Sequence, residues 1–250
     1  MIERLLRPIW GKNRMALRLE DVTVGYYQDI MILLGLTLSA QDEKITTIIG
    51  PNGAGKSTVL KTAFGFLNPM KGKVYLDSRE ITGTKPYQML RIGMTFVMQE
   101  RGVFPFLTVQ ENLELGAWLF RSDRERLKTA IEAIYDKYPM LGKRRKVPAG
   151  SLSGGEQRLL EIGKALMTNP QVVLFDEPTA GLSPIAAKLI FQEVERLKEE
   201  QRTILMVEQN VRRAMGITDY VYVLEFGRVT FHGPVGEIRL EEAVAPWVKW

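Results

Sequence analysis

The stretch KITTIIGPNGAGKSTVLKTAF, Lys44 to Phe64, contains an apolar β-branched run, a glycine-rich turn and a helix-forming segment, in that order. The turn fits the pattern G-x-x-x-x-G-K-[ST] over Gly50 to Ser57, and a strand before it and a helix after it are the context that this pattern needs. Successive backbone N–H groups of such a turn point inward and hold phosphate oxygens. The stretch therefore predicts a phosphate-binding loop between a buried strand and a helix.

Each residue of this loop has an expected part in binding a nucleotide. Backbone N–H groups supply most contacts, Lys56 brings positive charge to the β and γ phosphates and so also counts as catalytic, and Ser57 offers its hydroxyl to Mg²⁺. The expected cofactor-binding residues of the loop are Gly50, Pro51, Asn52, Gly53, Ala54, Gly55, Lys56, Ser57 and Thr58.

The rest of the chain alternates strand and helix patterns. Compact β-branched runs at 171–177, 202–208 and 220–227 are typical of buried, mostly parallel strands. LRLEDVTV, from residue 17 to 24, alternates apolar and polar residues, which predicts a half-solvated antiparallel strand. The expected fold class is α/β: a P-loop NTPase core with a mostly parallel sheet, helices on both faces and antiparallel N-terminal strands. The apolar run Ile30 to Leu38 is interrupted by Gly35 and Thr37 and predicts a strand with a turn.

The chain divides into an extension and one domain. Residues 1–14, MIERLLRPIWGKNR, are expected to be an N-terminal extension, and residues 15–250 the nucleotide-binding domain. From about residue 87 to 169 charged helical sequence such as SDRERLKTAIEAIYDKY replaces the strand pattern, so we expect a helical subdomain inserted there. The extension has apolar residues at helical spacing but also Pro8, so a packed arm and a surface anchor are both open.

The composition limits the classes of site. The 250 residues include no cysteine and one histidine, His232, which excludes a disulfide framework, a thiolate metal site and a site built on several histidines. The net charge of +5 comes from interspersed acidic and basic residues, as in a solvated mixed-charge surface. No apolar run approaches the ~18 residues that a membrane span needs.

Two carboxylates, Asp176 and Glu177, end the apolar run QVVLFDE. Carboxylates at the C-terminal end of a buried strand lie where α/β proteins bind their ligands. We expect Asp176 to hold Mg²⁺, through water, and Glu177 to be the general base that orients the water attacking the γ-phosphorus. The alternative is that both carboxylates cap the helix that follows Pro178 and Thr179.

The segment LSGGEQ, Leu152 to Gln157, supports two interpretations. Ser153 followed by Glu156 is typical of a helix N-cap with a capping box. Two glycines in a first helical turn cost roughly 1 kcal/mol each relative to alanine, which capping does not explain. Glycine lets another group approach the unpaired N–H donors of a helix N-terminus, and such donors favour an anion.

The phosphate loop, LSGGEQ and VVLFDEP, in this order, resemble the ATP-binding subunits of ABC transporters over nearly all of Met15 to Gly236. The resemblance implies ATP and Mg²⁺ as cofactors, and ATP hydrolysis coupled to transmembrane transport as the activity. It also implies that Ser153, Gly154 and Gly155 bind the γ-phosphate held by the other subunit of a dimer.

The same resemblance assigns single residues. Gln99 matches a glutamine that senses Mg²⁺ and the γ-phosphate, with a plain polar loop residue as the alternative. Tyr26 matches the aromatic residue that stacks on adenine, and Tyr27 beside it keeps that choice open. Gln209 stands where the family has a catalytic switch histidine, and Ser183 where it usually has an aspartate. Glutamine can donate a hydrogen bond to the γ-phosphate but carries no charge, so we expect weaker transition-state stabilisation.

Three segments, PAGSLSGGEQRLLEIGKALM, DEPTAGLSP and MVEQN, together resemble one of the two ATP-binding subunits of branched-chain amino-acid importers. The implied partners are a second ATP-binding subunit, identical or different, membrane permease subunits docked near Gln99 and 104–107, and indirectly a solute-binding protein. The implied location is the cytoplasmic face of the cell membrane, as a peripheral protein.

Other functions stay open. Amide and urea importers share the pattern, and lipid or polysaccharide exporters have similar ATPases. A soluble ABC ATPase acting on nucleic acid or ribosomes would need long coiled-coil insertions or two cassettes, and neither is present, so no nucleic-acid partner is expected. A small-molecule kinase would share the phosphate loop but has no use for LSGGEQ.

Overall fold

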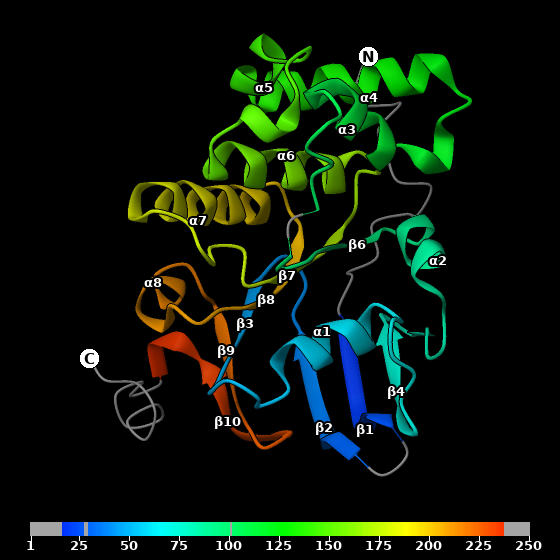
Figure 1. Cartoon of the computed structure of the whole chain (residues 1–250). Helices are drawn as coiled ribbons and strands as arrows, with labels where there is room; N and C mark the ends of the chain where they lie inside the picture. Colours follow the sequence, from blue (N-terminus) through cyan, green and yellow to red (C-terminus); the bar gives the residue numbers. More distant parts are fainter. Residues whose placement is uncertain (1–16, 28–29, 101, 238–250) are drawn as a thin grey trace.

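The computed structural model describes residues 17–27, 30–100 and 102–237, so the expected extension at 1–14 lies outside the described residues. Figure 1 shows a layer of helices above a long sheet, with a second sheet packed below. The strands are β1 Leu17–Tyr27, β2 Ile30–Ala40, β3 Ile45–Ile49, β4 Lys71–Leu76, β5 Arg79–Glu80, β6 Met94–Val97, β7 Val172–Asp176, β8 Thr203–Val207, β9 Tyr220–Glu225 and β10 Arg228–Pro234. The α-helices are α1 Lys56–Ala63, α2 Pro86–Arg91, α3 Val109–Gly116, α4 Arg124–Lys137, α5 Pro139–Lys143, α6 Gly154–Leu166, α7 Pro184–Glu199 and α8 Val211–Met215.

The central sheet has the order β10-β9-β3-β8-β7-β6 within the described residues. Its strands are parallel except β10, which pairs antiparallel with β9 at the edge. Side chains alternate between its two faces: Val172 and Leu174 of β7 face one core cluster, and Val173 and Phe175 the other. The prediction of a buried, mostly parallel sheet is confirmed.

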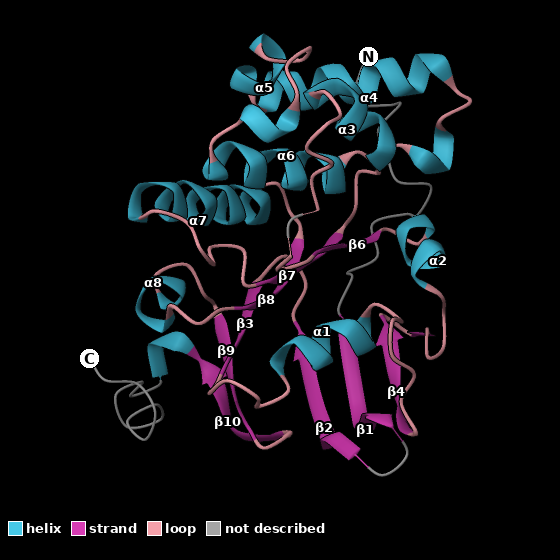
Figure 2. Cartoon of the chain, in the orientation of Figure 1, coloured by secondary structure: helices cyan, strands magenta, loops and turns pink. Residues whose placement is uncertain are grey.

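Helix α1 lies between the two sheets (Figure 2). Its residues Val59, Leu60 and Ala63 share one core cluster with the N-terminal strands and the lower face of the central sheet. The opposite face of the central sheet packs on α7 and on the helices around α6. Since both faces of the parallel strands are covered, near-continuous apolar runs are the pattern that this sheet requires.

The N-terminal sheet, in the order β2-β1-β4-β5, is antiparallel as predicted. The turn predicted within 30–38 is wrong, because β2 continues unbroken from Ile30 to Ala40. Gly35 takes a positive φ of 67° and the β1–β2 register shifts beside it, so the glycine forms a local irregularity of the ladder. Thr37 stays in the strand, where its Oγ1 accepts a hydrogen bond from the Asp21 N–H at 3.0 Å.

The helices α3 to α6 form the upper layer and fall within the range expected for the helical insertion. That range also contains β6, which pairs with β7 in the central sheet. The helices of the upper layer therefore begin only at Val109. No helix among the described residues has the length and apolar character to cross a membrane.

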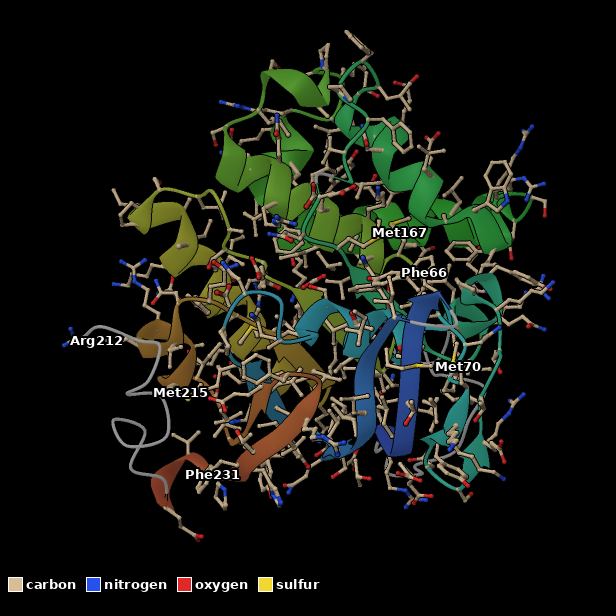
Figure 3. All side chains as sticks on the ribbon, turned by 60° about the horizontal axis from the view of Figure 1, so that its bottom comes forward. Phe66, Met70, Met167, Arg212, Met215 and Phe231 are labelled. Atoms are coloured by element: carbon tan, nitrogen blue, oxygen red, sulfur yellow. The ribbon has the colours of Figure 1, made fainter. Side chains whose placement is uncertain are left out.

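Helix α8, which follows the loop after β8, is two-sided. Figure 3 shows Arg212 pointing outward from it, whereas Val211 and Met215 are buried. The buried side of α8 anchors the C-terminal end of the loop that carries Gln209.

Candidate functional site

The loop from Gly50 to Gly55 connects β3 to α1, as the sequence predicts. A Cβ on Gly50 would lie 2.1 Å from the carbonyl oxygen of Leu224, so only glycine fits against β9. Gly55, at φ 102°, is the N-cap of α1, and no side chain caps this helix. The first-turn N–H groups are therefore left for a ligand, and their dipole favours an anion.

Lys56 is the first residue of α1, and its side chain reaches back into this loop. Its Nζ donates hydrogen bonds to the carbonyl oxygens of Gly50, at 2.8 Å, and Pro51, at 3.0 Å. Burial lowers the pKa of this lysine, while the carboxylates of Glu177 and Asp176 act in the opposite direction. A buried ammonium with two acidic neighbours is suited to neutralise phosphate charge.

Ser57 and Asp176 meet although 119 residues separate them in the chain. The Ser57 hydroxyl donates to Asp176 Oδ1 at 2.9 Å, and burial raises the pKa of Asp176 while this hydrogen bond lowers it. No group of three acidic or histidine side chains that could hold a metal occurs in the described part of the chain. Mg²⁺ bound with nucleotide phosphates needs only one or two protein ligands, so the Ser57–Asp176 pair fits this ion.

Glu177 is held from two sides. Gln99 Nε2 donates to Glu177 Oε2 at 2.9 Å, and Gln209 Nε2 donates to Glu177 Oε1 at 2.7 Å. The backbone of Glu177 has a positive φ of 47°, which is rare for a residue with a side chain. The structure thus brings Gln99, Glu177 and Gln209 together beside Ser57 and Asp176.

Asp176 and Glu177 do not cap the next helix. Helix α7 begins at Pro184, and its N-cap is Ser183, whose hydroxyl accepts a hydrogen bond from the Ala186 N–H at 3.3 Å. The capping interpretation of the two carboxylates is therefore wrong. Serine and aspartate are both good N-caps, so Ser183 keeps one local role that an aspartate would have.

The segment LSGGEQ begins helix α6. Ser153 is the N-cap, its hydroxyl accepts from the Glu156 N–H at 3.4 Å, and Glu156 Oε2 accepts from the Ser153 N–H at 2.7 Å, which confirms the capping box. A Cβ on Gly155 would approach Ala186 Cβ to 3.0 Å, so close packing against α7 explains one glycine. Ser153 and Gly154 are exposed. The exposed Gly154 has no packing reason within this chain.

Tyr26 lies near the end of β1 with half of its surface exposed. An exposed ring is available for stacking, but its contact with adenine stays a prediction. The side chain of Tyr27 lies outside the described residues.

Glu208 and Thr179 were not singled out as site residues from the sequence. Both line a pocket of about 280 Å³ together with Glu177 and Gln209. Glu208 directly follows the apolar strand β8, just as Glu177 directly follows β7, and that shared position was the signal available in MVEQN.

The family model for the ABC transporter matches residues 33–180 of this chain. A probable branched-chain amino acid transport ATP-binding protein of Archaeoglobus fulgidus, LivF, is 40% identical over 90% of this chain and 95% of its own length. The high-affinity branched-chain amino acid transport ATP-binding protein BraG of Pseudomonas aeruginosa is 38% identical over 85% of this chain and 90% of its length. BraF, a second high-affinity branched-chain amino acid transport ATP-binding protein of the same organism, is 31% identical over 91% of this chain and 94% of its length.

Solved structures agree with the sequence relatives. The ADP conformation of an ATP-binding cassette of an ABC transporter superposes with a TM-score of 0.84 at 30% identity, and covers 94% of this chain and 98% of its own. A nucleotide-free cassette from an ABC transporter gives 0.79 at 32% identity, over 88% of this chain and 91% of its own.

Proposed function

This chain belongs to the ABC transporter family as an ATP-binding, ATP-hydrolysing subunit, and from that premise we propose that it powers import of branched-chain amino acids through partner membrane subunits. The substrate class is supported by the names of the relatives that are 40% and 38% identical, both branched-chain amino acid transport ATP-binding proteins. The observation that carries the catalytic part is Glu177, whose carboxylate lies between Gln99 and Gln209 beside the phosphate loop.

We assign the roles as follows. Backbone N–H groups of residues 50–58 and the Lys56 ammonium hold the phosphates, and Tyr26 stacks on the adenine. Ser57 and Asp176 would hold Mg²⁺, and Gln99 would lie beside the ion. The ion would neutralise charge on the β and γ phosphates. Glu177 accepts a proton from the attacking water, while Gln209 orients the carboxylate by its hydrogen bond and reaches toward the γ-phosphate.

The second half of each site comes from another subunit. Ser153 and Gly154 are exposed at the N-terminus of α6, which belongs to the helical layer, whereas α1 packs between the sheets (Figure 1). We propose a head-to-tail pair in which these N–H donors bind the γ-phosphate on the partner's phosphate loop. BraG and BraF are two different branched-chain amino acid transport ATP-binding proteins of one organism, which favours a partner different from this chain.

The membrane partners would dock on the helical layer. Phe104 and Phe106 are 53% and 95% exposed in the loop that joins the Gln99 segment to α3. These exposed phenylalanines follow Gln99, which contacts Glu177, by a few residues along the chain, and they offer a surface through which a permease subunit could sense the nucleotide. The chain would then be a peripheral protein at the cytoplasmic face of the membrane. Its link to a solute-binding protein would be indirect, through the permease subunits.

The first experiment is affinity purification of the tagged full chain from its native membranes in mild detergent. We expect two hydrophobic permease proteins and a second ATP-binding subunit, followed by leucine uptake in vesicles that carry the complex, a solute-binding protein and ATP. Recovery of soluble or ribosomal proteins alone, with normal ATP binding, would exclude the importer. Recovery of a permease complex that transports an amide or a lipid would keep the ATPase and change the substrate.

A further inference from the structure

Glu208 is a buried carboxylate that no catalytic role so far uses. It follows β8 directly and is 2% exposed. No ion pair involves it within the described residues, and burial raises its pKa despite the hydrogen bonds that it accepts. Holding such a group buried costs folding free energy when it is ionised, so stability alone does not explain a glutamate here.

The carboxylate accepts hydrogen bonds from two loops. Glu208 Oε1 accepts from the backbone N–H of Thr179 at 3.1 Å and from its hydroxyl at 2.7 Å. Glu208 Oε2 accepts from the backbone N–H of Gln209 at 3.1 Å and of Asn210 at 3.3 Å. All four partners donate, so both oxygens of Glu208 act as acceptors, each toward a different loop.

These contacts close a ring around the catalytic base. Thr179 lies two residues after Glu177, and the Gln209 side chain returns to Glu177 Oε1 at 2.7 Å. The Glu177 N–H also bonds to the Val207 carbonyl at 2.9 Å, just before Glu208. The backbone at both ends of the Glu177–Gln209 hydrogen bond is therefore fixed by one buried side chain.

We propose that Glu208 is a positioning residue for ATP hydrolysis, which ties the loop after β7 to the loop after β8 and so sets the distance between Gln209 and Glu177. It acts through Thr179 and Gln209, which it contacts directly. The proposal rests on the assignment of Glu177 as the general base. A misplacement of about 1 Å at a reacting group can cost about 100-fold in rate.

The test is Glu208→Gln in the full chain, purified with its partner subunits. Glutamine has the same shape but sets an NH₂ group against donors, either the N–H and hydroxyl of Thr179 or the N–H groups of Gln209 and Asn210. We expect kcat for ATP to fall about 10- to 100-fold, KM and the Kd for ATP to change less than about 3-fold, and the Tm not to fall. Thr179→Val, which removes one donor, should lower kcat less. The double variant should be no slower than Glu208→Gln, because both changes break the same link.

Two reference variants separate the possible failures. Glu199→Gln removes an exposed carboxylate of α7 and should leave kcat unchanged. Glu177→Gln should abolish hydrolysis. If Glu177→Gln keeps wild-type activity, the proposed base is wrong. If Glu177→Gln is inactive but Glu208→Gln keeps wild-type kcat, the positioning role is wrong. The positioning role would also be wrong if Glu208→Gln lowered the Tm and weakened ATP binding along with kcat, because Glu208 would then be only structural.

Discussion

The carboxylate of Glu177 accepts one hydrogen bond from each of two glutamine side chains, Gln99 at 2.9 Å and Gln209 at 2.7 Å. Neutral amide donors fix the orientation of a carboxylate without the strong stabilisation of its charge that a cation would give. The two amides therefore fix the direction in which Glu177 would present its oxygens to an attacking water. The residues proposed to bind phosphate, Gly50 to Thr58, lie on other elements, so we expect binding and hydrolysis to be separable.

Glu177→Gln should lower kcat by at least about 100-fold, since general-base catalysis contributes about 10²–10⁴. ATP affinity should change little, because the phosphate loop is untouched. Steady-state phosphate release and equilibrium binding of ATP measure the two quantities. Size-exclusion chromatography with light scattering should show an ATP-dependent pair that persists. A hydrolysis rate equal to wild type would remove Glu177 from its role.

Gln209 gives a second test at this scale, because glutamine does not titrate. In Gln209→His the ring would lie beside the Glu177 carboxylate, which raises the histidine pKa above its usual value of about 6.5. The charged ring would stabilise γ-phosphate charge more than glutamine does. The ratio of variant kcat to wild-type kcat should rise as the pH is lowered from about 9 to about 6.5. A ratio that is flat across this range would show that position 209 does not face developing charge.

At the scale of helices and strands, what the sequence predicts depends on whether the cause is local. The loop from Gly50 to Thr58 was predictable, because its glycines, strand and helix are contiguous. The irregularity at Gly35 was not, since it depends on the register between β1 and β2. Glu208 was missed for the same reason: its partner Thr179 is 29 residues away, on another loop.

The loop after Glu177 leads into helix α7, whose N-cap is Ser183. The contribution of this N-cap to stability can be tested directly. Ser183→Ala should lower the free energy of unfolding by about 1 kcal/mol, because the Ala186 N–H loses its acceptor. Ser183→Asp should keep the cap and most of the stability. Urea unfolding followed by circular dichroism measures both. Equal losses in the two variants would mean that the cap contributes nothing.

The junction of α4 with α7 is a second element-scale feature. Glu193 Oε1 accepts from the Tyr138 hydroxyl at 2.6 Å and pairs with Lys137 Nζ at 2.9 Å. The Lys137 and Glu193 side chains are 11% and 7% exposed, so neither charge is well hydrated.

Glu193→Ala should destabilise the chain by about 2 kcal/mol, because the buried Tyr138 hydroxyl loses its acceptor and the Lys137 ammonium keeps only Glu200 of its two carboxylate partners. Glu199→Ala, on the exposed side of the same helix, should stay within about 0.5 kcal/mol of wild type. Thermal unfolding of both variants measures the difference. A loss at Glu193 no larger than that at Glu199 would show that this ion pair does not hold the helical layer to α7.

At the scale of the whole molecule, one chain carries both of the parts that we propose as the two halves of a nucleotide site. The phosphate loop lies at the end of β3 between the sheets, and the exposed N-terminus of α6 lies in the helical layer (Figure 2). A subunit with both halves can complete a partner's site and have its own completed in turn, which is a head-to-tail arrangement. ATP can favour such a pair only through contacts made when the subunits are together.

Gly154→Asp tests this arrangement, because it places a negative charge at the exposed helix start where the partner's γ-phosphate would bind. The variant should bind ATP on its own phosphate loop with normal affinity, yet the complex should lose at least about 90% of hydrolysis at the site that α6 completes, since like charges repel where an anion must dock. In a Glu177→Gln background, the same change should abolish the ATP-dependent pair. Gln192→Asp, which adds the same charge on the exposed side of α7, should leave binding, pairing and hydrolysis intact. If Gly154→Asp instead weakens ATP binding to the isolated chain and leaves pairing unchanged, α6 serves its own chain's nucleotide and the head-to-tail pair is wrong.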